Sequence, residues 1–501
     1  MKRIIASLHL VVVLLTGVIG SLTSCDFGKK PVNNVEFVMP EGGLDTSKTI
    51  TIKFYHQMGA ALQDILNETI VEFNKIYPNI VIEHESLGDY DGVRNQIKTE
   101  IAVGNQPNLA YCYPDHIALY NKAGAVQTLD VLINDPTYGF TAEQIADFIE
   151  GFYNDGKVFG DGLMYSLPVV RSTEVLYYNV EALVAAGVVD EHGNAAPPTT
   201  WEEMAIACEK LKAWDPKCIP LGYDSEGNWF ITMCEQYGSP YTSAENGGQF
   251  LFDNEQNRSF VKMFREWYQK KWVTTEELSG GYTSALFTGE SSSSANSTVE
   301  AGTRCYMCIG STGGATYQQP NMTNGKFEFT VGIASMPQVD PANPKVISQG
   351  PSVTVFKNED PQEVLASWLF AKYLATDITF QARVSMNNGY NPVIKSCTEN
   401  ETYAEWLASA STENIQAYAD FLAKADVNGT ANITAYAVKV AIEQENAYYA
   451  SPAFNGSSVA REQVALLLQK CFTLEATADN LDAKIKEAFA DCVEECEYQS
   501  N

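Results

Sequence analysis

Four aromatic side chains stand beside polar or flexible residues, a setting that suits them to binding the hydroxyl groups of a polyol. They lie in the segments GDYDG (Tyr90), YCYPDH (Tyr113), EGNWF (Trp229) and NNGYNP (Tyr390). Aromatic rings pack against the C–H faces of sugars, while neighbouring Asp, Asn and Ser side chains bond hydroxyl groups. Each ring alone could equally belong to the core, because the chain has 26 tyrosines. Together, the four segments suggest a polyol-binding site.

No catalytic or cofactor motif stands out in the sequence. None of the histidines falls in an H-E-x-x-H pattern, and there is no G-x-S-x-G, G-x-x-x-x-G-K-[ST] or strand-linked G-x-G-x-x-G segment. The nearest glycine-rich loop, IGSTGGATY (309–317), fits a plain turn as well as a loop whose N–H groups face an oxygen-rich ligand. Cys305 and Cys308 lack a second ligand pair at zinc spacing, so we favour structural or free thiols. We expect a binding protein without catalytic residues, cofactor or metal.

The first 24 residues have the pattern of an export signal. Lys2 and Arg3 precede an apolar run that ends in Leu-Thr-Ser-Cys, which resembles the lipobox of bacterial lipoproteins. A plain signal peptide or a membrane span with an incidental cysteine is the alternative. On the lipoprotein hypothesis, 1–24 is the signal peptide, Cys25 carries the lipid and 25–48 forms a flexible tether. The protein would then be anchored to the cell membrane and face the extracellular or periplasmic side.

The charge of the chain limits its partners. The formal net charge is −29, and removal of a signal that contains Lys2 and Arg3 would make it more negative. Such a surface repels nucleic acid, so we exclude nucleic-acid binding. An anionic ligand would need a local positive pocket. The ten cysteines besides Cys25 could pair in an exported protein, but the pairing cannot be deduced from the sequence.

The elements that must position the aromatic segments alternate between strand and helix. The pattern predicts a strand at 49–55, a helix over 62–77 and a strand at 79–86, which together form a parallel βαβ unit. Strands at NLAYCY and EVLYYN and helices at 91–103 and after Thr200 continue the alternation. The length exceeds that of one core. We therefore predict an α/β protein with two lobes, each a mostly parallel sheet flanked by helices.

The ordered segments resemble one protein family, the solute-binding lipoproteins of ABC importers for sugars and related polyols. The resemblance rests on the lipobox and on segments that run from about residue 49 to 480: ITIKFYHQM, EFNKIYPNIVIE, GNQPNLAYCYPDHIALYNKAGAVQTLDVLI, LPVVRSTEVLYYNVEALVAAGV, PPTTWEEMAIACEKLK, GPSVTVFK and GYNPVIKS. FYHQM, STEVLYYN and GYNPVIK are most similar to the glycerol-phosphate-binding members.

The resemblance implies a fold in which two lobes are joined by crossing hinge strands. It implies an N-terminal lobe of 49–170 plus 307–353 and a C-terminal lobe of 174–303 plus 356–496, with hinges near 169–175, 304–309 and 353–357. A ligand would be trapped between the lobes and delivered to a two-subunit ABC permease.

The resemblance also implies the ligand contacts. They are Tyr90, Asp115 in place of a Glu, Ser172, Trp229, Ser311, Gly350 and Tyr390, with His56 at the strand end FYHQM. The related proteins have an Arg near the C-terminal loop SPAF for the phosphate, whereas here the closest is Arg461. Arg171 could replace it or bond sugar hydroxyls. Alternatively, Arg171 forms a structural salt bridge to Glu174 or another acid.

Two other classes of function are compatible with these features. An exported glycan-active enzyme would need a closely supported pair of carboxylates, and the chain has too many acidic residues to single one out. A surface adhesin or sensor could use the same two-lobed fold. The preferred interpretation is a binding protein for a sugar or a glycerol-phosphate-like polyol.

Overall fold

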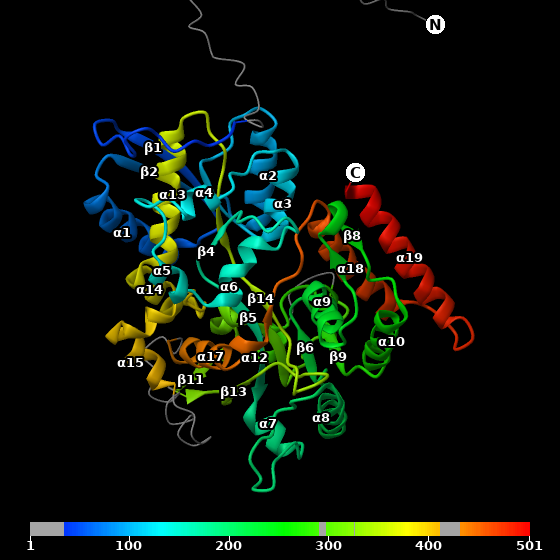
Figure 1. The fold of residues 1–501 in the computed structure, drawn as a ribbon. Helices are drawn as coiled ribbons and strands as arrows, with labels where there is room; N and C mark the ends of the chain where they lie inside the picture. Colours follow the sequence, from blue (N-terminus) through cyan, green and yellow to red (C-terminus); the bar gives the residue numbers. More distant parts are fainter. Residues whose placement is uncertain (1–34, 290–296, 325, 411–430, 501) are drawn as a thin grey trace, which may run out of the picture.

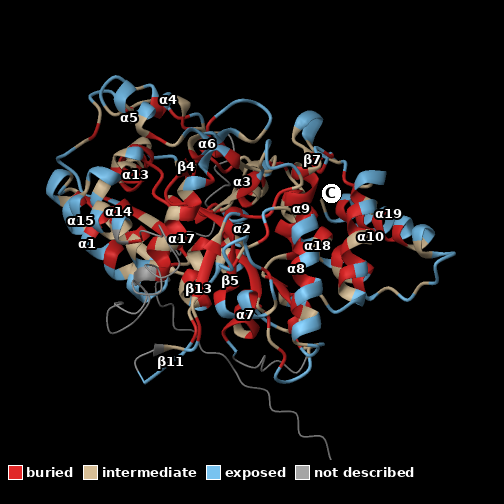
Figure 2. Cartoon of the chain, turned by 90° about the horizontal axis from the view of Figure 1, so that it is seen from below, coloured by how far each residue is buried: buried red, intermediate tan, exposed pale blue. Residues whose placement is uncertain are grey.

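The computed structural model describes residues 35–289, 297–324, 326–410 and 431–500, which form two α/β lobes (Figure 1). The predicted signal peptide and Cys25 lie outside these residues. Within them, no helix is both long and apolar enough to cross a membrane. The buried residues gather in the sheets and on the helix faces that cover them, and the outer helix faces are exposed (Figure 2).

The first lobe contains a five-stranded sheet in the order β2-β1-β3-β15-β4. Its strands are β1 (Ile50–His56), β2 (Ile80–Ser86), β3 (Leu109–Cys112), β4 (Leu167–Pro168) and β15 (Ser352–Val355). The helices of this lobe are α1 (Ala60–Ile76), α2 (Tyr90–Ile101), α3 (Pro114–Lys122), α4 (Asp130–Ile133), α5 (Ala142–Asp147), α6 (Glu150–Asn154), η1 (Asp155–Lys157), α13 (Pro361–Thr376), α14 (Ile378–Asn388), η4 (Lys395–Glu399) and α15 (Glu401–Ser409).

The second lobe contains a sheet in the order β16-β14-β5-β10-β6-β9, with β13 also paired to β5. Its strands are β5 (Ser172–Asn179), β6 (Leu221–Tyr223), β9 (Val273–Thr275), β10 (Met307–Ser311), β13 (Val331–Ala334), β14 (Val346–Gln349) and β16 (Tyr448–Tyr449). Its helices are α7 (Val180–Ala185), α8 (Trp201–Trp214), α9 (Glu226–Gln236), η2 (Glu245–Gly247), α10 (Glu255–Gln269), α11 (Glu276–Ser279), α12 (Ser284–Thr288), η3 (Thr312–Gln318), α17 (Ala431–Glu443), η5 (Glu445–Ala447), α18 (Ser457–Thr473) and α19 (Leu481–Ser500). Two short hairpins join β7 (Thr242–Ser243) to β8 (Gln249–Phe250) and β11 (Met322–Thr323) to β12 (Lys326–Phe327).

The predicted βαβ unit is confirmed in the first lobe. Strands β1 and β2 pair in parallel from Ile50↔Ile80 to His56↔Ser86, and α1 connects them. Helix α1 buries Leu66 and Phe73 on its sheet-facing side, as the helical spacing of its apolar residues predicts. Both sheets are nevertheless mixed, because β15 is antiparallel to β3 and β5 is antiparallel to β10.

Strand β5 is buried along its whole length, which explains its continuous apolar run. Leu176 and Tyr178 belong to one core cluster, while Val175 and Tyr177 belong to another on the opposite face. Successive side chains of a strand point to opposite faces, so covering both faces of the sheet buries all of them. Asn179 then caps α7, since its Oδ1 accepts a hydrogen bond of 2.8 Å from the N–H of Ala182.

The observed lobe boundaries correct the predicted ones. Residues 307–353 are expected in the first lobe, but β10, β13 and β14 are strands of the second sheet. Helices α13 and α14 are expected in the second lobe, but Trp368 and Phe380 pack in the core of the first. The expected hinge at 304–309 leads into an interior strand of the second sheet, because β10 pairs along β5. The chain passes directly from a strand of one sheet to a strand of the other at 169–171 and 350–351, and it returns to the second sheet between β15 and β16.

Arg171 lies in the segment 169–171 and bonds it to the segment 350–351. Its side chain is 1% exposed, and Nε donates a hydrogen bond of 3.0 Å to Oδ2 of Asp155. One terminal nitrogen donates to Oγ of Ser352 at 2.9 Å. The other lies 2.7–3.2 Å from the carbonyl oxygens of Val170, Gly350 and Pro351. The structural ion pair left open by the sequence is therefore present, with Asp155 as the acid.

We expect Arg171→Met to lower the free energy of unfolding by about 3–5 kcal/mol, because it leaves the Asp155 carboxylate buried without its cation. Urea unfolding measures the change. Combining Arg171→Met with Asp155→Asn should recover part of the loss. The control is Lys75→Met, which breaks the exposed ion pair with Glu72 and should cost less than about 1 kcal/mol. An equally small loss for Arg171→Met would contradict the structural role.

Candidate functional site

A cavity of about 800 Å³ lies between the lobes, and its wall comes from both of them. The first lobe contributes Gln57, Gly88, Asp89, Tyr90 and Tyr390. The second contributes Glu174, Asp224, Ser225, Asn228, Glu276, Tyr282, Ser284, Ser311, Gly313, Gly314, Tyr317, Gln318 and Gln349. We refer to it as the larger cavity.

The ends of parallel strands position the first-lobe wall. Gln57 follows β1, and Tyr90 begins α2 directly after the loop that leaves β2. Asp89 caps α2, because its Oδ1 accepts a hydrogen bond of 2.7 Å from the N–H of Gly92. Gln57 in turn donates a hydrogen bond of 2.7 Å to the hydroxyl of Tyr90. The wall therefore lies at the carboxyl edge of the sheet, where ligands bind in open α/β sheets.

The glycine-rich segment IGSTGGATY lies on the opposite wall and forms a strand-to-helix turn. Ser311 ends β10 and caps η3, since its Oγ accepts a hydrogen bond of 3.1 Å from the N–H of Gly313. A Cβ atom on Gly313 would stand 3.1 Å from the ring of Tyr390. A small residue at this point lets the two lobes approach each other across the cavity.

A second cavity of about 250 Å³ adjoins the first, and both share Ser225, Asn228 and Gln349 as lining residues. We refer to it as the smaller cavity. Arg461 of α18 lies on its wall and donates a hydrogen bond of 2.5 Å to Oδ1 of Asn228. The Nε atom of Arg461 is 3.8 Å from Oδ2 of Asp115, which belongs to the first lobe.

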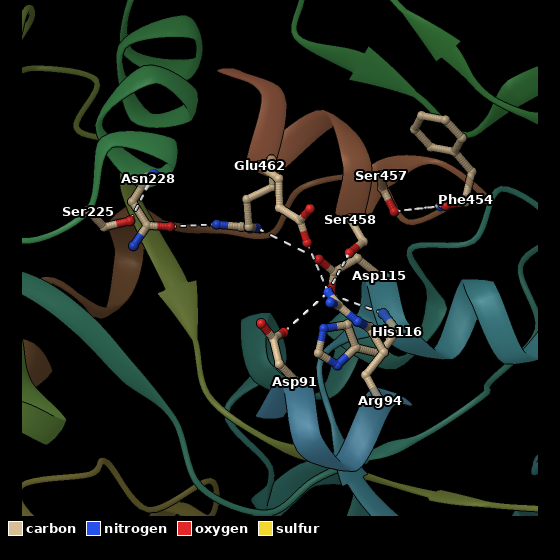
Figure 3. A network of polar contacts seen from close by, with 11 residues as sticks. Asp91, Arg94, Asp115, His116, Ser225, Asn228, Phe454, Ser457, Ser458 and Glu462 are labelled. Atoms are coloured by element: carbon tan, nitrogen blue, oxygen red, sulfur yellow. Dashed lines mark hydrogen bonds and ion pairs between the residues drawn. The ribbon is translucent and has the colours of Figure 1, made fainter. Parts of the chain in front are cut away.

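The polar contacts around this cavity connect the lobes. Figure 3 shows Arg94 of α2 between Asp91 on its own helix and Ser458 and Glu462 on α18. The Arg94–Glu462 ion pair measures 3.0 Å. Helix α18 therefore faces the first lobe with both a surface ion pair and a guanidinium on the cavity wall.

The structure brings together six of the nine ligand contacts expected from the sequence. Tyr90, Ser311 and Tyr390 line the larger cavity. The smaller cavity is lined by Asp115, Arg171 and Gly350. As far as the structure describes the two walls, Ser172, Trp229 and His56 belong to neither.

The three remaining residues lie inside the protein. Trp229 is fully buried, and its ring stacks on Tyr223 at 4.9 Å within the second-lobe core. His56 is buried beside His84, with their ring nitrogens 2.9 Å apart, and desolvation lowers the pKa of His56 to about 4. Ser172 is a buried residue of β5 that pairs with Gln349. Their positions on a helix or a strand direct these side chains into the protein. The residue types around them do not indicate this direction.

Sequence reasoning missed the carboxyl groups of the larger cavity. Glu174 is only 2% exposed and accepts hydrogen bonds from the hydroxyl of Tyr223 at 2.6 Å and from Nδ2 of Asn228 at 3.1 Å. Desolvation raises the pKa of Glu174 to about 7. Desolvation, followed by the nearby charge of Asp224, raises the pKa of Glu276 to about 8. One feature of the sequence could have indicated a buried carboxyl group: Glu174 directly precedes the apolar run of β5.

Comparison with known proteins identifies the family. A model described as bacterial extracellular solute-binding protein matches residues 68–411. The chain belongs to this family. The sn-glycerol-3-phosphate-binding periplasmic protein of Escherichia coli strain K12 is 26% identical to this solute-binding protein over 382 residues, or 73% of this chain and 80% of that protein. The protein of the same name in Salmonella typhimurium is 30% identical over 201 residues, which span 39% of this chain and only 43% of that relative.

Solved structures of solute-binding proteins share the fold. The cyclic alpha-maltosyl-1,6-maltose binding protein of Arthrobacter globiformis has a TM-score of 0.64 and 16% identity, covering 89% of this chain and 99% of that one. The UgpB protein of Mycobacterium tuberculosis in complex with glycerophosphocholine has a TM-score of 0.62 and 15% identity, covering 89% and 98%. The predicted two-lobed fold is therefore confirmed.

Glu174 should make the stability of the solute-binding protein fall with pH. Its folded-state pKa lies above its ordinary value of 4.5, so the folded state holds the proton longer and stability is lost as pH rises to about 7. We expect Glu174→Gln to remove about 2–3 kcal/mol of that decline between about pH 5 and pH 8. Urea unfolding of both proteins at the two pH values measures it. Equal pH dependence in both would contradict the assignment.

Proposed function

We propose that this protein is the ligand-capturing lipoprotein of an ABC importer. It would take up a sugar or a glycerol-phosphate-like polyol between its lobes and deliver it to the permease. The observation that supports this most is the pair of adjoining cavities, of about 800 and 250 Å³, whose walls come from both lobes. Ligand sites of this kind usually enclose about 300–1,000 Å³. A ligand that contacts both lobes favours the closed arrangement over the open one.

The two crossing segments are suited to act as a hinge. Gly350 has a φ of +123°, and a Cβ there would stand 2.9 Å from Cα of Arg171 in the other segment. Only glycine fits such a conformation at so close an approach. The two crossings can therefore lie side by side and bend together, while Arg171 bonds to both.

The residues on the walls suit hydroxyl groups. Tyr90, Ser311 and Tyr390, which were expected as ligand contacts, are accompanied by Asn228 and Gln349. Serine and amide side chains can donate hydrogen bonds to hydroxyl groups and accept hydrogen bonds from them, while tyrosine rings pack against C–H groups. We assign these residues to ligand binding, with Asp115 and Gly350 on the wall of the smaller cavity.

Arg461 is the residue we assign to a phosphate group. Its guanidinium donates a hydrogen bond to Asn228, and its side chain is 36% exposed and lines the smaller cavity. There the guanidinium can bond two oxygen atoms of a phosphate. Arg171 cannot bind the phosphate group, because its N–H groups already donate hydrogen bonds within the hinge. The relatives named as sn-glycerol-3-phosphate-binding proteins support a phosphorylated ligand.

Two further parts of the proposal concern the mature protein. The Leu-Thr-Ser-Cys segment supports processing before Cys25 and lipid attachment to that residue, so the protein would be held at the outer face of the cell membrane. A binding role without turnover predicts that a ligand released by denaturation has an unchanged mass, which mass spectrometry measures.

Thermal unfolding of residues 26–501 with a panel of ligands tests the ligand class. The panel contains sn-glycerol 3-phosphate, glycerophosphocholine, glucose and maltose. A bound compound at about 100 times its Kd adds about 2.7 kcal/mol and raises Tm by several degrees. We expect at least one compound of the panel to do so.

The variant Arg461→Gln separates phosphate recognition from polyol binding. It should lose about tenfold or more in affinity for the phosphorylated compounds and little for the neutral sugars. The matched control is Arg383→Gln, since Arg383 is similarly exposed, at 33%, but pairs with Glu68 on the outer surface of the first lobe. An Arg461→Gln protein that binds glycerol phosphates as tightly as the wild type would contradict the assignment.

A further inference from the structure

The charges on the wall of the larger cavity are of one sign. Asp89, Glu174, Asp224 and Glu276 line it, and no Lys, Arg or His is among its lining residues as far as the structure describes them. A carboxylate on an enclosed wall repels anions and attracts cations. The cationic Arg461 faces the smaller cavity instead. The two adjoining cavities therefore differ in electrostatic character.

The carboxyl groups of this wall have no cationic partner. None of the four forms an ion pair with any residue that the structure describes. Asp224 accepts hydrogen bonds from the N–H and hydroxyl of Thr283, at 2.7 and 2.6 Å, and Glu174 is held by Tyr223 and Asn228. Of the four, Glu174 is the buried one, at 2% exposure. Burying a carboxyl group without a counter-charge is costly, so such groups concentrate where function requires them.

A second observation points to a ligand that donates hydrogen bonds. Gln318 lines the cavity and is 2% exposed, and its Oε1 accepts no hydrogen bond from the described residues. Its Nε2 faces Oδ2 of Asp224 at 3.4 Å, which fixes the orientation of the amide. Gln57, on the other wall, likewise has a buried Oε1 without a partner. Both of these buried, unpaired oxygen atoms belong to residues that line the larger cavity, and both can only accept hydrogen bonds.

Tyrosine rings complete the cavity. Tyr90 and Tyr390 lie on the first-lobe side, while Tyr282 and Tyr317 lie on the second-lobe side and are 64% and 73% exposed. Exposed aromatic rings at the edge of an acidic cavity can attract a cation through their faces. A metal ion is a poor match, because no group of three His, Cys, Asp or Glu side chains among the described residues is placed to hold one.

We propose that the larger cavity binds a cationic nitrogen of the ligand, an ammonium carried on a polyol, while the smaller cavity with Arg461 holds its anionic or hydroxyl-rich part. This inference rests on the proposed function and narrows its ligand class. Two sources carry the same chemistry: an amino sugar, whose N–H groups would donate to the carboxylates, and a polyol ester of a quaternary amine, which would pack against the tyrosines.

Binding of such a cation should strengthen as pH rises. Desolvation raises the pKa of Glu174 to about 7 and that of Glu276 to about 8. Charged and titratable groups that face these two carboxyls are Asp224, Glu226, Glu277, Arg461, Tyr223, Tyr282 and Tyr449. A cation favours the ionised carboxylates, so these groups must release protons before or during binding.

Calorimetric titration with matched compounds tests the inference. Glycerophosphocholine is compared with sn-glycerol 3-phosphate, and glucosamine with N-acetylglucosamine, which lacks the positive charge. We expect glycerophosphocholine near pH 8, or glucosamine near pH 7 where its amine is largely protonated, to bind about tenfold more tightly than its partner. Glycerophosphocholine keeps its charge at every pH used, so the rise in its affinity between about pH 6 and pH 8.5 reports the carboxyl groups.

The variant Glu276→Gln tests the wall directly. Glu276 is half-buried and its side chain accepts no hydrogen bond from the described residues, so folding should survive the change. It should reduce the preference for the cationic compound severalfold and weaken its pH dependence. The control is Glu209→Gln, since Glu209 is exposed on α8, is outside the cavity wall and is not among the charged groups that face Glu276.

The outcomes separate this inference from the function on which it rests. Equal affinity for the members with and without a cationic nitrogen in both pairs, or an unchanged preference in Glu276→Gln, would overturn the cation site and leave polyol capture intact. Failure of every compound of both panels to bind would overturn polyol capture and the cation site together. A preference for glucosamine identifies a primary ammonium, and a preference for glycerophosphocholine identifies a quaternary one.

Discussion

The hydrogen bonds of Arg171 are the interaction on which the arrangement of the two lobes depends. The side chain neutralises Asp155 in the first lobe and bonds to backbone oxygens in both crossing segments. A buried guanidinium is tolerated only when its donors are satisfied, so these two segments are held against each other. That geometry places the carboxyl edge of the first sheet opposite the Ser311 loop of the second, and the two cavities lie between them.

The electrostatic character of the cleft depends on which charged side chains are already bonded to other parts of the protein. Arg171 is bonded within the hinge, whereas Arg461 on α18 remains directed to the smaller cavity and lies near Asp115. The carboxyls of Glu174 and Glu276 remain without a cation on the larger wall. A strongly acidic protein thus offers its ligand one wall where arginines stand beside aspartates and another wall whose charged groups are all carboxyls. This division favours a ligand with two different ends over a uniform one.

Much of the fold could be predicted from the sequence because its patterns are local. Strand β1, helix α1 and strand β2 follow directly from alternating and helical apolar spacing, and the cap at Asn179 follows from residue type. Lobe boundaries were predicted less well. Strand β10 joins the second sheet through pairing with β5, and α13 returns to the first lobe through packing of Trp368. Neither long-range contact leaves a local signal.

Part of the candidate site could also be predicted, namely the residues whose position at the end of a local element brings them to the cleft. Tyr90 and Tyr390 follow elements whose ends meet at the cleft, so their loop positions were informative. Trp229 has a similar sequence setting, but it falls on the inner face of α9 and packs into the core. Arg461 was passed over because its distance from the SPAF loop hid the fact that α18 turns it toward Asn228.

Hydrogen–deuterium exchange tests the central claim, that one ligand is held by both lobes, most directly. The full mature chain is compared with and without the compound that raises Tm most. The account predicts slower exchange at 88–90 and 389–391 of the first lobe and at 224–228 and 311–318 of the second. Protection confined to one lobe, or to a surface outside the two cavities, would contradict it.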